Sequence, residues 1–288
     1  MGLIEAILYG LVQGITEWLP ISSTAHLRIL PVILGQPDPG AAFTAVIQLG
    51  TTLAVIIFFA KDLGGAIKAW FNSLRGVGKD TVEAKLAWGV FYGTLPIMLI
   101  GFLFKSVIKS DEFRSLYVIA TTLILNGILM AVAERVRRKR RSIEEVTVRD
   151  GIVVGLWQAL ALVPGMSRSG STIAGGLFTG LDRTTAARFS FLMSVPSIAA
   201  AGFYELYQER AHILGSQLMP TIVATVVSFV VGYASIAWLI KYIAKQGFTV
   251  FVIYRIVLGL LLLSLIAAGR IAPVSMSPDR AKVETPVR

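Results

Sequence analysis

Hydrophobic residues in this chain gather in long runs that short polar connections separate. Six of the runs have the length of a membrane-spanning helix, about 20 residues, and lie at 41–60, 86–108, 115–136, 184–207, 217–243 and 247–269. This pattern predicts an all-α polytopic membrane protein with six full transmembrane helices.

Two further apolar segments, residues 2–34 and 150–181, are interrupted and differ from these runs. Pro20 divides the first segment and Pro164 the second, and a cluster of serine and threonine residues follows each proline. We therefore expect each segment to form two half-helices that enter the membrane and return to the same side. Paired broken helices are typical of a binding site near the middle of a membrane.

The second half of the chain repeats the first. Three pairs of corresponding positions are Gln13 and Gln158, Ser23 and Ser167, and Phe43 and Phe189. We predict two repeats with inverted topology, each a re-entrant hairpin plus three transmembrane helices, because an odd number of crossings turns the second repeat upside down. The predicted boundaries are a single membrane domain at 1–271, with repeat one at 1–136, a basic cytoplasmic loop at 137–149 and repeat two at 150–271, and a polar tail at 272–288.

Composition supports a membrane location. The chain has 55% hydrophobic and 15% charged residues and a mean hydropathy of +0.72, whereas soluble domains have about 25% charged residues. The absence of cysteine excludes disulfides, thiolate metal sites and thiol catalysis. A formal net charge of +10 would suggest nucleic acid as a partner of a soluble protein, but here the basic residues lie in short loops between apolar runs. The positive-inside rule explains them better, so no nucleic-acid partner is expected.

Loop charges also indicate how the chain is oriented. Basic residues concentrate in the loop after the first span and in the run Arg137–Arg141, and the predicted topology places both on one side of the membrane. If this side is the cytoplasm, the termini and the first hairpin lie outside and the second hairpin enters from inside. Membrane lipid surrounds the spans, and the small residues of Gly64–Gly65 and Ala199–Gly202 fit either packing within one chain or a homodimer.

The first hairpin carries an ionisable residue within its apolar run. Gln13 and Glu17 are four positions apart, so both side chains lie on one face of the first half-helix. A charged group in an apolar membrane segment is costly and functional by default. Two other interpretations of Glu17 stay open: a carboxylate at the water interface, or an ion pair with Arg168 that only holds the fold.

Polar residues after the proline supply the start of the next half-helix. Ser22, Ser23 and Thr24 offer N-cap hydroxyls and free backbone N–H groups, and such a helix N-terminus binds anions. His26 comes within the first turn of this helix. A carboxylate, hydroxyls and an imidazole are the groups that an activated nucleophile or a proton shuttle requires, although hydroxyls in membrane helices often serve packing alone.

The second hairpin has an arginine in the corresponding region, within Pro164-Gly-Met-Ser-Arg-Ser-Gly-Ser-Thr172. Arg168 presents a planar fork that matches phosphate oxygens. The neighbouring hydroxyls and amides that we expect to bind the same anion belong to Ser167, Ser169, Gly170 and Thr172. Together the two hairpins predict an intramembrane cavity equipped for phosphoryl transfer from a lipid-anchored phosphate. The alternative is a secondary transporter or flippase for a lipid phosphate or another anion, because inverted repeats with broken helices are typical of transporters.

Three motifs resemble the signatures of the undecaprenyl-diphosphate phosphatase family, the bacitracin-resistance proteins. They are Gln13-Gly-Ile-Thr-Glu-Trp-Leu-Pro-Ile-Ser-Ser-Thr-Ala-His26, Val46-Ile-Gln-Leu-Gly50 and Pro164-Gly-Met-Ser-Arg-Ser-Gly-Ser-Thr-Ile173. The resemblance covers essentially the whole chain in length, order and repeat. The chain departs from the family pattern at Gln13, which takes the non-ionisable form of that position, and at Ala25, where a glycine is usual.

The resemblance implies hydrolysis of undecaprenyl diphosphate to the monophosphate and phosphate in the bacterial inner membrane, with the site open to the outer, periplasmic face. This reaction recycles the lipid carrier of cell-wall synthesis. A divalent cation, Mg²⁺ or Ca²⁺, is expected near Glu17, and Arg168 with its neighbouring hydroxyls is expected to bind the diphosphate. The nucleophile is Ser23, His26 or water, and the sequence does not choose among them.

Overall fold

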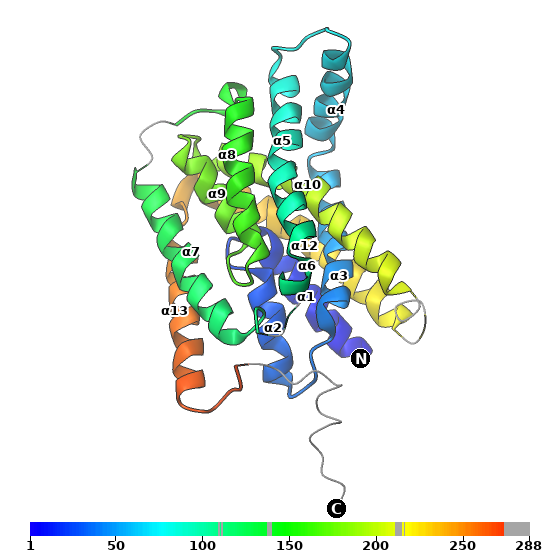
Figure 1. Cartoon of the computed structure of the whole chain (residues 1–288), viewed down its shortest axis with the longest axis vertical. Helices are drawn as coiled ribbons and strands as arrows, with labels where there is room; N and C mark the ends of the chain where they lie inside the picture. Colours follow the sequence, from blue (N-terminus) through cyan, green and yellow to red (C-terminus); the bar gives the residue numbers. More distant parts are fainter. Residues whose placement is uncertain (109, 111, 137–139, 211–214, 216, 274–288) are drawn as a thin grey trace, which may run out of the picture.

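The computed structural model describes all residues except 109, 111, 137–139, 211–214, 216 and 274–288. The described part is helical (Figure 1), and it contains no β-strand beyond one isolated bridge between Arg141 and Leu181. Its long apolar helices confirm the predicted all-α polytopic fold. Most of the predicted polar tail and the start of the predicted basic loop lie outside the described residues.

The six predicted spans correspond to long helices. These are α3 (Gly40–Phe58), α5 (Val82–Leu103), α7 (Leu116–Val136), α10 (Arg183–Gln208), α12 (Leu218–Gln246) and α13 (Thr249–Ala267). Five of them are long and apolar enough to cross a membrane alone, whereas α3 reaches that standard only with the next helix, α4 (Ala60–Leu74), from which it is bent by 80°. The run predicted at 86–108 ends as a separate short helix, α6 (Lys105–Ile108). The described chain thus has up to six spans.

Helix α4 lies in a segment that we predicted to be a loop, because basic residues interrupt the apolar run there. Its packing explains the difference. Trp70 lies against Trp88 of α5 with ring centroids 5.8 Å apart, and Trp88 Nε1 donates to Ser73 Oγ at 2.9 Å. Asp62 also binds Arg188 of α10 at 2.9 Å. These tertiary contacts order a helix where the sequence indicates a polar connection.

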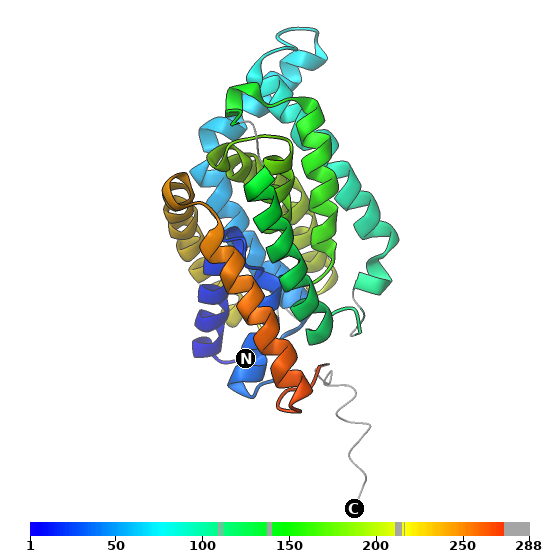
Figure 2. The ribbon, with the colours of Figure 1, turned by 90° about the vertical axis from the view of Figure 1, so that its left-hand side faces the viewer.

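Two helical hairpins enter the molecule from opposite ends. The first consists of α1 (Leu3–Trp18) and α2 (Ser23–Leu34), and the second of α8 (Val148–Ala159), the short 3-10 helix η2 (Leu160–Leu162) and α9 (Arg168–Phe178). Figure 1 shows the first hairpin in the lower half and the second in the upper half, with the turns near the middle. Figure 2 shows α7 and α13 side by side along one flank of the hairpins. Each interrupted segment therefore forms two half-helices, as predicted.

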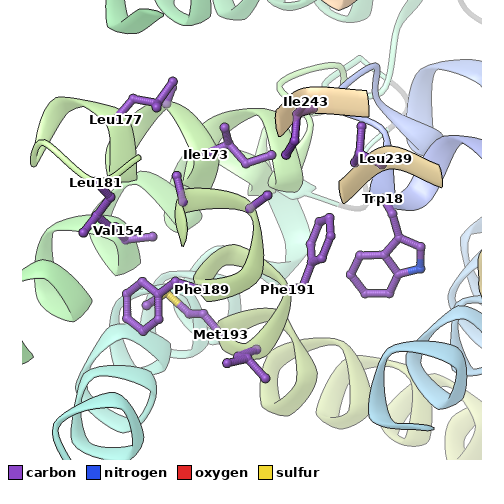
Figure 3. Close-up of a cluster of buried hydrophobic side chains, with 14 of the residues drawn as sticks. Trp18, Val154, Ile173, Leu177, Leu181, Phe189, Phe191, Met193, Leu239 and Ile243 are labelled. Carbon is purple, nitrogen blue, oxygen red and sulfur yellow. The ribbon is translucent and has the colours of Figure 1, made fainter. Parts of the chain in front are cut away.

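Trp18, the last residue of α1, belongs to the main buried hydrophobic cluster (Figure 3). Its indole packs edge-on against Phe191 of α10, with ring centroids 5.0 Å apart. Helix α9 contributes Ile173 to the same cluster, and α12 contributes Leu239. The end of α1, at the turn of the first hairpin, is therefore fixed in a core that helices of the second half of the chain largely build.

Glycines bring the second hairpin against α5 at backbone distance. A Cβ atom at Gly151 would lie 2.3 Å from Gly89 Cα, and one at Gly155 would lie 2.2 Å from Gly93 O. Small residues four positions apart on each helix are typical of close helix packing in membranes. Gly202 packs against α3 of the same chain. It belongs to the small-residue stretch Ala199–Gly202, for which the sequence also allowed a contact between subunits.

Arg141 holds the two ends of the second hairpin together. Its guanidinium binds both carboxylate oxygens of Asp150, at 2.6 and 2.9 Å, near the start of α8. The same group donates to Thr179 O at 2.8 Å, at the end of α9. Hydrogen bonding to Asp150 raises the pKa of Arg141, as expected for a guanidinium paired with a carboxylate. This residue of the basic loop therefore has a structural role.

We expect Arg141→Ala to lower the free energy of unfolding by about 2 kcal/mol, because it leaves the buried carboxylate of Asp150 without its charged partner. Thermal unfolding of the purified protein in detergent measures the change. Arg149→Ala removes an exposed arginine from the same helix start and should change the unfolding free energy by less than about 0.5 kcal/mol. Equal effects of the two substitutions would contradict a specific role of Arg141.

Candidate active site

A cavity of about 160 Å³ lies where the two hairpin turns meet. Both turns bound it, together with side chains from α3, α5 and α10. Six of the predicted site residues line the cavity: Glu17, Ser22, Ser23, Thr24, Ser167 and Arg168. The structure therefore brings residues from the two halves of the chain, far apart in the sequence, to one space.

Glu17 is the centre of the hydrogen bonds at this cavity. Its Oε1 accepts from Arg168 Nη2 at 2.6 Å, and its Oε2 accepts from Ser23 Oγ at 2.7 Å and from Gln13 Nε2 at 2.9 Å. The side chains of Glu17 and Arg168 are only 4% and 11% exposed, so solvent screens their attraction weakly. The ion pair between Glu17 and Arg168, which was one of the open interpretations of the sequence, is present and joins the two hairpins.

Arg168 lies at the first position of α9, and its guanidinium reaches across to the first hairpin. The guanidinium carbon lies 5.5 Å from the centre of the Trp18 ring, which is a cation–π contact. Nη1 is 3.5 Å from Ser194 O of α10. Because a guanidinium has five N–H donors, Arg168 keeps donors for an anion in the cavity after these contacts are made.

The two half-helices that face the cavity begin in the same unusual way. Ser22 and Ser167 have φ values of 76° and 62°, and they are the only non-glycine residues with positive φ in the described chain. Ser22 Oγ accepts from Ala25 N–H at 3.3 Å, and Ser167 Oγ accepts from Gly170 N–H at 3.1 Å. These shared N-cap bonds make Ser22 the counterpart of Ser167, which corrects the alignment of Ser23 with Ser167. Strained backbone of this kind is concentrated at functional sites, and here it directs two positive helix ends to one cavity.

Gln13 supports Glu17 and does not line the cavity. It is fully buried, and its Nε2 also approaches Thr51 Oγ1 of α3 at 3.4 Å. In the second hairpin, Gln158 has an equivalent contact, because Ser197 Oγ of α10 donates to Gln158 Oε1 at 3.3 Å. Each half of the chain thus links the glutamine of its first half-helix to a hydroxyl of the next long helix.

Three other predicted site residues also support the turn and do not line the cavity. Ser169 Oγ donates to Leu19 O in the first hairpin at 3.2 Å. Thr172 Oγ1 donates to a main-chain carbonyl of its own helix at 2.7 Å. Gly170 packs so closely against α7 that a Cβ atom there would lie 2.8 Å from Asn126 Oδ1. Ser169 therefore links the two hairpins, whereas Thr172 and Gly170 fix α9 itself and its packing against α7.

His26 lies beside the cavity with both ring nitrogens occupied. Nδ1 is 2.8 Å from Ser22 O, and Nε2 is 2.6 Å from the hydroxyl of Tyr254 on α13, whose ring stacks on the imidazole. The described residues that line the cavity do not include His26. Ser23 thus lines the cavity, whereas His26 contacts the carbonyl of Ser22, the residue directly before Ser23.

Arg255 of α13 contacts both turns of the site, and the sequence pattern alone did not identify it. It is fully buried and donates to Pro20 O in the first turn at 3.0 Å and to Gly165 O in the second at 2.9 Å. The sequence feature that could have identified Arg255 is its charge within the apolar run 247–269. A charged residue inside a membrane helix indicates function. Gln48 of α3 also lines the cavity, and it lies in one of the three motifs without an assigned role.

The cavity offers few protein ligands for a metal ion. The described residues contain no group of three or more His, Cys, Asp or Glu side chains that could hold one. Glu17 supplies a carboxylate, and Gln13 Oε1 is a buried acceptor without a hydrogen-bond partner in the described structure. Mg²⁺ sites often take one or two carboxylates from the protein and further oxygens from substrate phosphates. The residues therefore fit a cation that binds together with a phosphate substrate.

We expect Gly165→Ala to disrupt the second turn. Gly165 has a φ of 89°, and a Cβ atom there would lie 2.1 Å from Thr122 Oγ1 and 2.5 Å from Ile119 O, so the unfolding free energy should fall by more than about 2 kcal/mol. Gly76→Ala is the matched control, because Gly76 has a φ of 88° but no atom within 4 Å of an added Cβ. It should cost only about 1 kcal/mol of backbone strain. Similar melting temperatures of the two variants in detergent would contradict the close packing of this turn.

The sequence matches the family model of the bacitracin resistance protein BacA over residues 6–261, which include both hairpins except the first three residues of α1, and most of α13. It is also similar to proteins named undecaprenyl-diphosphatase. The relative from Myxococcus xanthus is 49% identical, with 96% of this chain and 93% of the relative covered. The relative from Chlorobaculum tepidum is 47% identical, with 95% of this chain and 100% of the relative covered. The chain therefore belongs to the bacitracin resistance protein BacA family.

Proposed function

We propose that this chain is an integral membrane phosphatase that converts undecaprenyl diphosphate into undecaprenyl phosphate and phosphate. The reaction returns the lipid carrier to cell-wall synthesis. Relatives that are similar over nearly the whole chain carry the name undecaprenyl-diphosphatase. The observation in the structure that carries the proposal is the convergence of Glu17, Ser23 and Arg168 from two hairpins at one cavity.

The cavity suits a diphosphate headgroup on an apolar chain. Arg168 provides a charged fork for phosphate oxygens, and the N-termini of α2 and α9 add free backbone N–H groups from the two hairpins. Ile97 of α5 and Ile198 of α10 also line the cavity. These apolar side chains suit the prenyl chain where it leaves the headgroup for the lipid.

Ser23 is the nucleophile that the geometry supports best. Its hydroxyl donates to Glu17 Oε2 at 2.7 Å, which is the distance expected for a general base that takes up the proton. Attack by Ser23 Oγ on the terminal phosphorus forms a phosphoserine ester and breaks the bridging P–O bond, so undecaprenyl phosphate leaves. Water then displaces phosphate from the ester, and Glu17 returns the proton to Ser23 Oγ. Throughout, Arg168 stabilises the charge on the phosphoryl oxygens.

A divalent cation, Mg²⁺ or Ca²⁺, is part of this proposal. Glu17, which lines the cavity, would hold it together with phosphate oxygens of the substrate. When bound, the cation neutralises part of the negative charge of the diphosphate. The protein groups would still supply the nucleophile and the proton acceptor.

In the proposed orientation, the protein lies in the bacterial inner membrane with the cavity open to the outer, periplasmic face. The α4–α5 connection and the start of α8 lie at the upper end of Figure 1, and basic residues concentrate in and around these segments. The positive-inside rule makes this end cytoplasmic. The first hairpin, which carries Glu17 and Ser23, then enters the membrane from the outer side.

The direct test is phosphate release from farnesyl or undecaprenyl diphosphate by the purified protein in detergent, with Mg²⁺, with Ca²⁺ and after treatment with EDTA. We expect release that requires the cation. Ser23→Ala and Arg168→Gln should each lower kcat at least about 100-fold, because they remove the nucleophile and a donor that stabilises the transition state. His26→Ala should lower kcat only about tenfold, since it disturbs the turn without removing a reacting group.

Ser264→Ala is the control for these variants. It removes an exposed hydroxyl of α13 that donates to Leu260 O, and kcat should stay at the wild-type value. A Ser23→Ala protein with full activity would remove the serine from the mechanism. A wild-type protein that moves a lipid phosphate across proteoliposomes without releasing phosphate would contradict the enzyme and favour the transporter.

A further inference from the structure

Arg255 lies within α13, and its guanidinium donates to four main-chain carbonyls. Nη1 binds Pro20 O at 3.0 Å in the first hairpin turn, and Nη2 binds Gly165 O at 2.9 Å and Met166 O at 3.2 Å in the second. Nε binds Leu123 O of α7 at 3.3 Å. One fully buried side chain therefore connects α7 to both turns at once.

This arrangement places a charge inside the molecule without a carboxylate partner. The ion pairs found among the described residues do not include Arg255. A buried ionisable group within a membrane helix is expensive, so its presence indicates function. Well-packed neutral residues would fill the same volume at a lower cost. The hydrogen bonds to four carbonyls, which one guanidinium can donate at once, explain why an arginine occupies this position.

The carbonyls that Arg255 binds in the two turns lie close to the two strained N-caps. Pro20 is two residues before Ser22, and Met166 immediately precedes Ser167. These two serines have positive φ and cap the N-termini of α2 and α9. The position of each carbonyl therefore sets the start of a half-helix that carries a reacting group.

We propose that Arg255 is a positioning residue of the phosphatase. It holds the two turns at the separation at which Glu17 and Ser23 of the first hairpin meet Arg168 of the second. The planar guanidinium has donors on three nitrogens and reaches three chain segments, whereas a lysine offers one nitrogen. The catalytic consequence rests on the proposed function, but the link between the turns is measurable without substrate.

The first measurement compares kcat of Arg255→Gln and Arg255→Lys with the wild-type value on farnesyl diphosphate. We expect kcat to fall about 100-fold for the glutamine variant and about tenfold for the lysine variant, because small displacements of reacting groups have effects of this size. Size-exclusion chromatography and circular dichroism establish that each variant is folded.

Arg183→Lys is the matched control, since it replaces a second guanidinium by an ammonium group. Arg183 Nε donates to Glu134 Oε1 at 2.7 Å, and the residue does not line the cavity in the described structure. The substitution should leave kcat within about twofold of the wild-type value.

The second measurement follows the hairpins themselves. The chain has no cysteine, so Gln36→Cys just beyond α2 and Arg149→Cys in α8 place one spin label at an exposed position of each hairpin. Double electron–electron resonance then gives the distance distribution between the labels. We expect Arg255→Gln to shift or broaden this distribution, and Arg183→Lys to leave it unchanged.

Reduced kcat together with an altered label distribution supports the proposal. An Arg255→Gln protein with wild-type kcat, or one with reduced kcat and an unchanged distribution, would overturn it. If the glutamine variant does not fold, the lysine variant decides by the same two criteria. Wild-type protein without phosphatase activity would overturn the proposed function, while a distribution that responds to Arg255 would still establish the link between the turns.

Discussion

The ion pair between Glu17 and Arg168 is the contact on which the arrangement of this protein depends. Its members come from the two hairpins, their nearest atoms are 2.6 Å apart, and both side chains are almost fully buried. Loss of one partner would leave a buried charge unpaired, which costs about 3–5 kcal/mol in protein interiors. Because the same carboxylate also binds Ser23, the contact that joins the hairpins also places the hydroxyl that we assign as nucleophile.

The backbone around this pair is held in a conformation that it would not adopt alone. Ser22 and Ser167 have positive φ values, at a cost of about 1–3 kcal/mol each. Arg255 binds carbonyls beside both serines, and Trp18 anchors the end of α1 in the hydrophobic core. Packing and main-chain hydrogen bonds thus offset the local strain, and the strained turns direct the N-termini of two half-helices to one cavity.

Much of this arrangement is predictable from the sequence, because prolines, hydroxyl clusters and charged residues stand out within apolar runs. Glu17 and Arg168 are recognisable on that ground. Arg255 carries the same signal, but its partners are main-chain carbonyls, which a pattern of side chains does not reveal. The orientation of His26 is not predictable either, since Tyr254 of the last helix decides it. Helix α4 was not predicted, because aromatic contacts with α5 order a segment of polar composition.

The measurement that tests this account most directly is a double-mutant cycle for kcat/KM with Glu17→Gln, Arg168→Gln and the protein that carries both substitutions. If the two residues act as one pair, each single substitution already removes the contact. The double variant is then no slower than the slower single variant, within about threefold. If the two losses multiply, the residues act independently, and the ion pair between the hairpins is not the contact that organises the site.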